Sequence, residues 1–162
     1  MTDTEFEKTV REFSEMVYRV ALNICRNPQN SEDVMQNVFL RLYKYGKKDI
    51  EKSKEYLKAW LIRVTVNESK RMLRTSAKAD YVPLEEVANT LFAEESESRD
   101  VFNYVMKLPQ KYRVVIYLYY YEGYSAKEIA NILRRNEATI RTQLSRAREM
   151  LRSNLKENDY EE

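Results

Sequence analysis

The stretch from Ser125 to Leu151 constrains this chain most, because it reads as two short amphipathic helices joined by a polar turn. Ser125 and Glu128 have the spacing of a capping box, in which each side chain accepts a hydrogen bond from the other residue's backbone N–H. An apolar stripe runs along one side of each helix, at Ile129, Ala130 and Leu133 and then at Ile140, Leu144, Ala147 and Leu151. The pattern predicts a helix-turn-helix.

The side of the second helix opposite its apolar stripe suits DNA. It carries Arg141, Thr142, Ser145, Arg146 and, at its edge, Arg148. A guanidinium can bond two acceptors at once, and short hydroxyls allow a helix to approach bases and phosphates closely. Neighbouring positions complete the candidate contacts: Lys127, Arg135 and Thr139. A solvated basic face is the alternative interpretation. Residues 105–155, however, hold ten Lys and Arg against four Asp and Glu, and polyanion binding is the simplest use of that surplus.

Composition predicts an all-α protein of two small domains. Two Gly and three Pro in 162 residues provide little of the turn chemistry that sheets need. Charge is segregated, with +5 in residues 1–78, −6 in 79–104, +6 in 105–155 and −3 in the last seven. We therefore expect a helical domain over residues 1–78, a flexible acidic linker over 79–103, a second helical domain over 104–156 and an acidic tail over 157–162.

Three helices are expected in the first domain. Periodicity places them at about 4–26, from Asn30 or Ser31 to before Gly46, and at about 55–76. The core positions expected on the second and third are Val34, Val38, Leu42, Leu57, Trp60, Leu61, Val64 and Met72. Phe39 and Leu40 fall partly outside the stripe, beside Asp33, Gln36 and Asn37. They either widen the core or form a protein-binding patch.

A second basic surface lies in this domain. From residue 41 to 78, twelve basic residues face four acidic ones. Its cations cluster along the third helix and the loop before it, at Lys47, Lys48, Lys52, Lys54, Lys58, Arg63, Lys70, Arg71 and Arg74. The segment is a second nucleic-acid candidate, separate from the helix-turn-helix.

Residues 79–103 have low helical periodicity, which favours a linker. Beyond them we expect a short helix that ends before Pro109 and another from about Gln110 to Glu122, closed by Gly123 in a left-handed conformation. The tyrosines of that second helix and of the residue after Gly123 are expected to form a packing floor: Tyr117, Tyr119, Tyr120, Tyr121 and Tyr124.

The residues give little support for catalysis. The chain has no His, one Cys and no glycine-rich phosphate loop, so we expect no enzyme activity, no metal site and no cofactor. No apolar run reaches the ~20 residues of a membrane span, and the N-terminus lacks a signal peptide's apolar stretch. We expect a cytoplasmic protein that does not insert into the membrane.

Four segments, in order and spacing, carry a family resemblance: NSEDVMQNVFLRLYKY, AWLIRVTVNESKRML, LPQKYRVVIYLYYYEGYSAKEIANIL and TIRTQLSRAREMLR. The chain resembles the extracytoplasmic-function (ECF) sigma factors, the smallest class of the bacterial sigma-70 family. The resemblance covers nearly the whole chain. It implies sigma domains 2 and 4 joined by a linker, with core RNA polymerase, promoter DNA and an anti-sigma factor, which can hold the protein at the membrane, as partners.

The resemblance also implies roles for residues. Asp33, Gln36, Asn37, Phe39 and Leu40 match the patch that docks on core polymerase. Residues 47–58, which include Lys47, Lys48, Lys54 and Lys58, match the loop that captures an unpaired base of the −10 element. The helix that follows the separated strand is matched by Arg63, Asn67, Lys70, Arg71 and Arg74. The face that reads the −35 element is matched by Arg141, Thr142, Ser145 and Arg146.

One position departs from the family. The turn of the helix-turn-helix usually has Gly followed by an apolar residue, whereas here Arg134 and Arg135 follow Leu133. A residue other than glycine costs about 1 kcal/mol in a left-handed turn. Either the turn is built differently or the domain tolerates the strain, and the two arginines can instead grip phosphate.

We therefore interpret the chain as an accessory sigma factor without chemistry of its own. A free-standing helix-turn-helix regulator is the first alternative, and binding to core polymerase discriminates it. A helical adaptor that binds only proteins is the second, although such a protein has no reason to carry +8 between residues 41 and 78.

Overall fold

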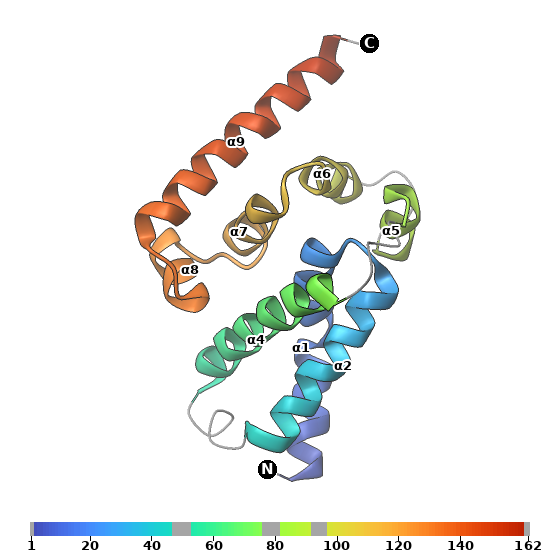
Figure 1. Ribbon diagram of the computed structural model, residues 1–162, viewed down its shortest axis with the longest axis vertical. Coiled ribbons are helices and arrows are strands. Elements are labelled where there is room, and N and C mark those ends of the chain that lie inside the picture. Colours follow the sequence, from blue (N-terminus) through green and yellow to red (C-terminus); the bar gives the residue numbers. More distant parts are fainter. Residues whose placement is uncertain (1, 47–52, 76–81, 92–96, 161–162) are drawn as a thin grey trace. The chain divides into compact units, whose positions relative to one another are not determined.

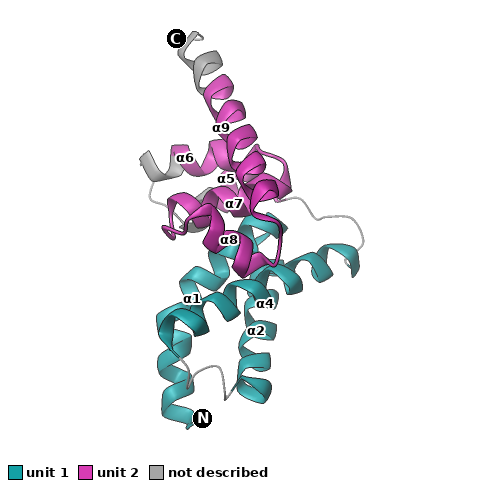
Figure 2. Ribbon diagram, turned by 90° about the vertical axis from the view of Figure 1, so that its left-hand side faces the viewer, with its two compact units in different colours: residues 1–81 teal, residues 82–162 magenta. Residues whose placement is uncertain are grey.

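The computed structural model describes residues 2–46, 53–75, 82–91 and 97–160, and the regular structure of these ranges is entirely α-helical (Figure 1). The all-α prediction is confirmed. The chain forms two compact units, Met1–Tyr81 and Val82–Glu162 (Figure 2). Within the described ranges, none of the helices has the length and apolar character needed to cross a membrane.

Unit 1 is a bundle of helices α1 (Asp3–Cys25), α2 (Pro28–Tyr45) and α4 (Lys54–Thr75), each of which packs on the other two (Figure 1). Its core contains fully buried aliphatic side chains from all three helices: Val17, Val20, Leu22, Val34, Val38, Leu42, Leu61 and Ile62. The predicted stripe of α2, Val34, Val38 and Leu42, is fully buried in this core, because one face of the helix is apolar.

The ends of α1 and α2 depend on short polar side chains. Thr2 and Glu5 form a capping box that starts α1. The predicted start of α2 at Asn30 or Ser31 is too late, since Asn27 caps the helix by accepting from the backbone N–H of Asn30 at 3.0 Å. Pro28 therefore begins α2 instead of separating the two helices, as proline suits a first turn whose N–H groups lack helical partners.

Helix α4 packs with a different face than predicted. Leu57 and Leu61 are buried as expected, but Trp60, Val64 and Met72 are only half-buried. The buried face is completed by Ile62, Val66 and three polar residues, Thr65, Glu68 and Ser69. Because part of the buried face is polar, the spacing of apolar residues alone did not predict which side of α4 is buried.

Unit 2 contains α5 (Leu84–Leu91), α6 (Glu97–Met106), α7 (Gln110–Tyr120), α8 (Ala126–Leu133) and α9 (Glu137–Tyr160). Helices α6, α7 and α8 pack on α9, while α5 packs on α6. The core is formed by fully buried side chains that include Met106, Ile116, Leu118, Ile129 and Ile140.

The low helical periodicity assigned to residues 79–103 is wrong for the described part of that segment. Helix α5 and most of α6 lie within it. Val87 is buried while Glu85 and Glu86 beside it are exposed, so α5 has one buried side. The surrounding acidic residues masked this one-sided pattern in the sequence.

The C-terminal ends of α7 and α9 also differ from expectation. Helix α7 ends at Tyr120 and not at Glu122, although Gly123 has the expected left-handed φ of 75°. This conformation lets the backbone N–H of Tyr124 donate to the Leu118 carbonyl at 3.1 Å. Helix α9 continues to Tyr160, into the segment 157–162 that was expected to be a tail.

Candidate nucleic-acid and protein interfaces

The first helix of the helix-turn-helix, α8, begins with the predicted capping box. The Ser125 hydroxyl accepts from the Glu128 backbone N–H at 3.1 Å, and the Glu128 carboxylate accepts from the Ser125 N–H at 3.0 Å. Hydrogen bonding from Ser125, first from its backbone N–H and then from its side chain, stabilises the ionised carboxylate and lowers the pKa of Glu128. The prediction is confirmed.

The turn between α8 and α9 is strained at one residue. Arg134 has the left-handed φ and ψ of 54° and 50°, so the domain tolerates a side chain in a conformation that favours glycine. The backbone N–H groups of Arg134 and Arg135 both donate to the carbonyl of Ala130. Arg135 is half-buried, and this burial lowers the pKa of its guanidinium.

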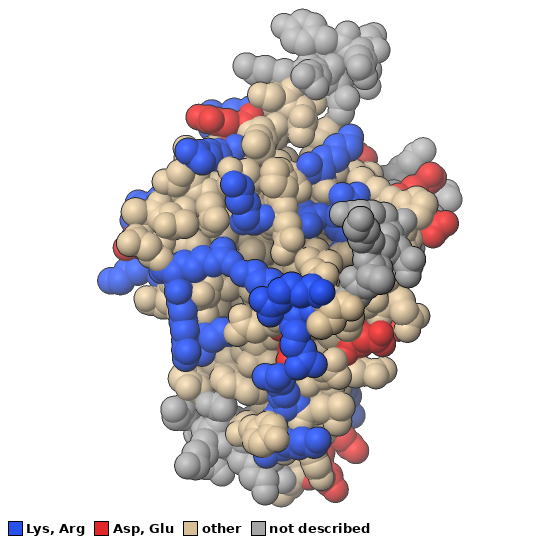
Figure 3. Space-filling view, viewed as in Figure 1, with Lys and Arg blue, Asp and Glu red and all other residues tan. Residues whose placement is uncertain are grey.

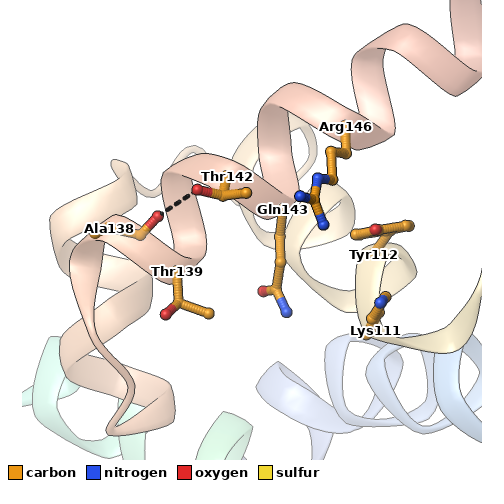
Figure 4. Close-up of a pocket in the computed structure, with 7 residues that line it drawn as sticks. All are labelled: Lys111, Tyr112, Ala138, Thr139, Thr142, Gln143 and Arg146. Atoms are coloured by element: carbon orange, nitrogen blue, oxygen red, sulfur yellow. Dashed lines mark hydrogen bonds between the residues drawn. The ribbon is translucent and has the colours of Figure 1, made fainter.

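Helix α9 divides into a buried stripe and an exposed face, as predicted. Ile140, Leu144 and Ala147 are buried, whereas Leu151, the fourth residue of the predicted stripe, is only half-buried. Candidate DNA contacts are exposed on the remaining surface of the helix, at Thr139, Arg141, Thr142, Ser145 and Arg146. Lys127 is also exposed, on α8. The Thr142 hydroxyl donates to the Ala138 carbonyl at 2.9 Å, which leaves its lone pairs available to a donor (Figure 4).

Arg141 and Arg146 border the exposed face of α9 on opposite sides, because five residues separate side chains by about 140° around a helix. Arg141 is held by Glu137, whose Oε1 accepts from Nε at 3.1 Å and from Nη2 at 2.8 Å. Arg146 instead lines an open pocket of about 370 Å³ between α9 and α7.

That pocket gathers residues that the sequence did not connect. Lys111 and Tyr112 of α7 lie opposite residues 138, 139, 142, 143 and 146 of α9 (Figure 4). Its lining has two cations and no acidic residue. The Gln143 Oε1 is buried and has no hydrogen-bond partner among the described residues. Helical spacing from Thr139 could have suggested Gln143, but Lys111 joins the site only through packing of α7 on α9.

Arg148 is half-buried and, unlike the other candidate contacts of α9, its guanidinium is engaged by α7. Its Nε donates to the Tyr120 hydroxyl at 3.0 Å, and its guanidinium lies over the Tyr119 and Tyr120 rings at 5.0 and 5.9 Å. The hydrogen bond with Tyr120 raises the pKa of Arg148. Tyr117 is buried as expected, but Tyr120 and Tyr121 are exposed, so the predicted tyrosine packing floor is wrong for these two residues.

From Arg63 onward, the candidate DNA contacts of unit 1 follow one side of α4. Arg63, Asn67, Lys70, Arg71 and Arg74 recur at helical spacing, and Asn67, Arg71 and Arg74 are exposed. Lys58 is half-buried in the first turns of the helix. At its N-terminus, Lys54 pairs with Glu12 of α1. Lys47, Lys48 and Lys52 lie outside the described residues. Figure 3 shows Lys and Arg predominating over Asp and Glu on the viewed face of each unit.

The predicted protein-binding patch on α2 is only partly exposed. Leu40 is 54% exposed, whereas Phe39 is 6% exposed and belongs to the core. Gln36 is exposed, and Asp33 and Asn37 are half-buried. The placement of Phe39 on a surface patch is therefore wrong, because α2 contacts both α1 and α4 and so needs a wider apolar stripe than one neighbour would require.

Comparison with protein families matches both units. The model of Sigma-70 region 2 matches residues 9–79, and that of Sigma-70 region 4 matches residues 98–151. Among relatives, the ECF RNA polymerase sigma factor SigW of Bacillus subtilis is 29% identical over 171 residues, with 94% of this chain and 89% of the relative covered. The RNA polymerase sigma-E factor of Streptomyces avermitilis is also 29% identical, with 97% and 88% covered.

Two solved structures share the fold. The sigma factor RpoE from Bartonella quintana, in complex with the anti-sigma factor NepR, superposes with a TM-score of 0.70 at 21% identity, covering 93% of this chain and 96% of that one. CnrH, in complex with the cytosolic domain of CnrY, superposes with a TM-score of 0.65 at 22% identity, covering 93% and 87%.

Proposed function

Because the chain belongs to the ECF sigma factors of the sigma-70 family, and is therefore a non-catalytic subunit of RNA polymerase, we propose which of its surfaces performs each step of promoter recognition. Family membership sets aside the free-standing regulator and the protein-only adaptor. The proposal assigns polymerase docking and the −10 element to residues 1–78, and the −35 element to residues 104–156.

The −35 element is read by α9. The observation that carries this assignment is the exposed face of α9 opposite its buried stripe, in a helix-turn-helix whose capping box and turn are intact. Arg141, Thr142, Ser145 and Arg146 contact base edges and nearby phosphates from this face. Lys127, Arg135 and Thr139 contact the DNA backbone beside it.

The −10 element is bound by the basic side of α4 and the loop before it. Arg63, Asn67, Lys70, Arg71 and Arg74 form a continuous row along the helix, which suits a strand whose phosphates repeat regularly. Lys47, Lys48, Lys54 and Lys58 contribute from the loop and the first turns of α4, and an unpaired base is held there.

Core polymerase docks on α2. Leu40 is a large apolar side chain exposed beside Asp33, Gln36 and Asn37, and such an arrangement of apolar centre and polar rim is typical of protein interfaces. Phe39 is buried next to Leu40 and contributes to the core of unit 1, not to the docking surface itself.

An inhibitor protein masks these surfaces until transcription is required. The proposal draws on the two related structures, in which the sigma factor RpoE is bound to the anti-sigma factor NepR and CnrH is bound to the cytosolic domain of CnrY. The chain acts in the cytoplasm, and an inhibitor anchored in the membrane would hold it there.

Transcription in vitro tests the proposed function. Core RNA polymerase with the full-length chain should transcribe fragmented genomic DNA from a limited set of start sites, and sequencing of the transcript 5′ ends should reveal a shared pair of upstream elements. Core enzyme alone provides the control. Start sites that share neither element, or the same sites without the chain, would contradict the proposal.

A further inference from the structure

Glu137 is the first residue of α9, and it binds Arg141, which we propose contacts the −35 element. Both hydrogen bonds from Arg141, from Nε at 3.1 Å and from Nη2 at 2.8 Å, end on the same oxygen, Oε1. The two side chains are 40% and 69% exposed, so the pair stands on the surface. An exposed ion pair contributes little to the free energy of folding. We therefore consider what this pair does in DNA binding.

The geometry leaves one edge of the guanidinium open. Glu137 takes the edge formed by Nε and Nη2. The end of the group still offers one N–H from Nη1 and one from Nη2, directed away from the carboxylate. Two parallel donors of this kind match the O6 and N7 acceptors of guanine in the major groove.

The carboxylate of Glu137 makes Arg141 favour a base edge over a phosphate. The edge of a guanine is neutral, so it meets the fork of Arg141 without repulsion from Glu137. A phosphate near the same fork meets a carboxylate as well as a guanidinium, and the net charge available to attract it is close to zero. The acid-free pocket at Lys111 and Arg146 lies across the exposed face of α9 and keeps its positive charge for the DNA backbone.

We infer that Glu137 is a specificity-determining residue of the −35 surface, which aims Arg141 at a guanine edge and prevents its attachment to phosphate. The inference rests on the proposed role of α9. It adds an acidic residue, outside the candidate contacts named above, to the residues that decide which promoters are chosen.

The test uses holoenzyme assembled with the full-length chain. Binding is titrated against salt on a selected promoter, on copies with single replacements in the −35 element, and on unrelated duplex DNA. Glu137→Gln keeps the side chain's size and removes its charge. We expect tighter binding to all duplexes. The slope of log K against log salt concentration should be steeper by about 0.9, because one more cation reaches a phosphate. Discrimination between bases of the −35 element should fall at least about fivefold.

Two further variants make the result specific to this pair. Glu137→Gln combined with Arg141→Ala should lose the steeper salt dependence, because the cation released by the first change is absent. Glu149→Gln removes the same charge from another exposed position of α9 and should keep wild-type discrimination. Unchanged discrimination in Glu137→Gln, or an equal loss in Glu149→Gln, overturns the inference. The wild-type titration is a separate readout, since indifference to the −35 replacements would refute the proposed role of α9 itself.

Discussion

Arg41 of α2 and Glu68 of α4 form an ion pair at 2.8 Å that joins the helix proposed to dock on polymerase to the helix proposed to bind the −10 strand. The Glu68 side chain is only 6% exposed, and Arg71 approaches its other oxygen at 3.9 Å. A buried carboxylate needs such partners, because removing one leaves charge without compensation.

Arg41→Ala should therefore lower the free energy of unfolding of unit 1 by about 1–3 kcal/mol. Lys44→Ala removes an exposed cation from the same helix and should change it by less than about 0.5 kcal/mol. Trp60 is the chain's single tryptophan and lies in unit 1, so its fluorescence in urea reports this unit. Equal losses in the two variants would show that Glu68 does not depend on Arg41.

Polymerase docking and folding should separate at two adjacent residues. Leu40→Asp should abolish binding to core enzyme without changing the urea midpoint, because Leu40 is exposed. Phe39→Ala should instead destabilise unit 1 by about 3–5 kcal/mol, the usual cost of truncating a buried aromatic residue.

Charge reversal tests the polar rim of the same surface. Asp33→Arg should weaken binding to core enzyme, whereas Glu32→Arg, the same change at the neighbouring exposed residue, should have a smaller effect. Pull-down of core enzyme by each variant measures both. Normal docking of Asp33→Arg and Leu40→Asp would place the polymerase surface elsewhere.

Arg148 should act by positioning α9 on α7. Arg148→Ala removes a hydrogen bond and a cation–π contact and should destabilise unit 2 by about 1–2 kcal/mol, with faster amide exchange in α7 and α9. Tyr120→Phe keeps the ring and should show a smaller loss. Promoter preference should stay the same in both variants. A changed base preference with unchanged amide exchange would restore the sequence prediction that Arg148 contacts DNA.

The capping box of α8 should give unit 2 a pH dependence. The folded state lowers the pKa of Glu128, so the stabilisation is present above the ordinary range of a glutamate and disappears as pH falls through the folded value. An NMR titration of the Glu128 side chain should show this lowered pKa. Ser125→Ala keeps the backbone N–H and removes only the side-chain hydrogen bond, so it should return the pKa part of the way toward the ordinary value. The same titration midpoint in both proteins would contradict the contribution assigned to the Ser125 side chain.

Local signals in the sequence were sufficient for the helix-turn-helix. The capping box, the stripe of α9 and the left-handed Gly123 each depend on residues close together in the chain, and the structure has all three. The strained turn at Arg134 was foreseen as one of two alternatives for the same reason. Sequence spacing also identified α1 and the core residues of α2.

The predictions that were wrong concern side chains whose burial or contacts depend on packing between helices. Phe39 is buried although it was a candidate surface residue, and Trp60 is half-buried although it was expected in the core. Both differences arise because α2 and α4 each contact two neighbouring helices, which the pattern of a single helix does not reveal. Arg148 reaches Tyr120 across 28 residues, and Lys111 joins α9 through α7. Helix α5 was missed because its acidic residues outweighed the short apolar pattern around Val87.

The central claim is that the two basic surfaces have different tasks, and one set of holoenzyme titrations tests it most directly. Promoters with single changes in the −35 or −10 element are bound by wild type, Arg141→Ala and Arg74→Ala, at several salt concentrations. Arg141→Ala should lose about 1–3 kcal/mol of base discrimination, confined to the −35 element. Arg74→Ala should weaken binding to every promoter alike and reduce the salt dependence by about one unit or less. If both variants lose the same affinity on every promoter, α9 only grips phosphate and the division of tasks is wrong.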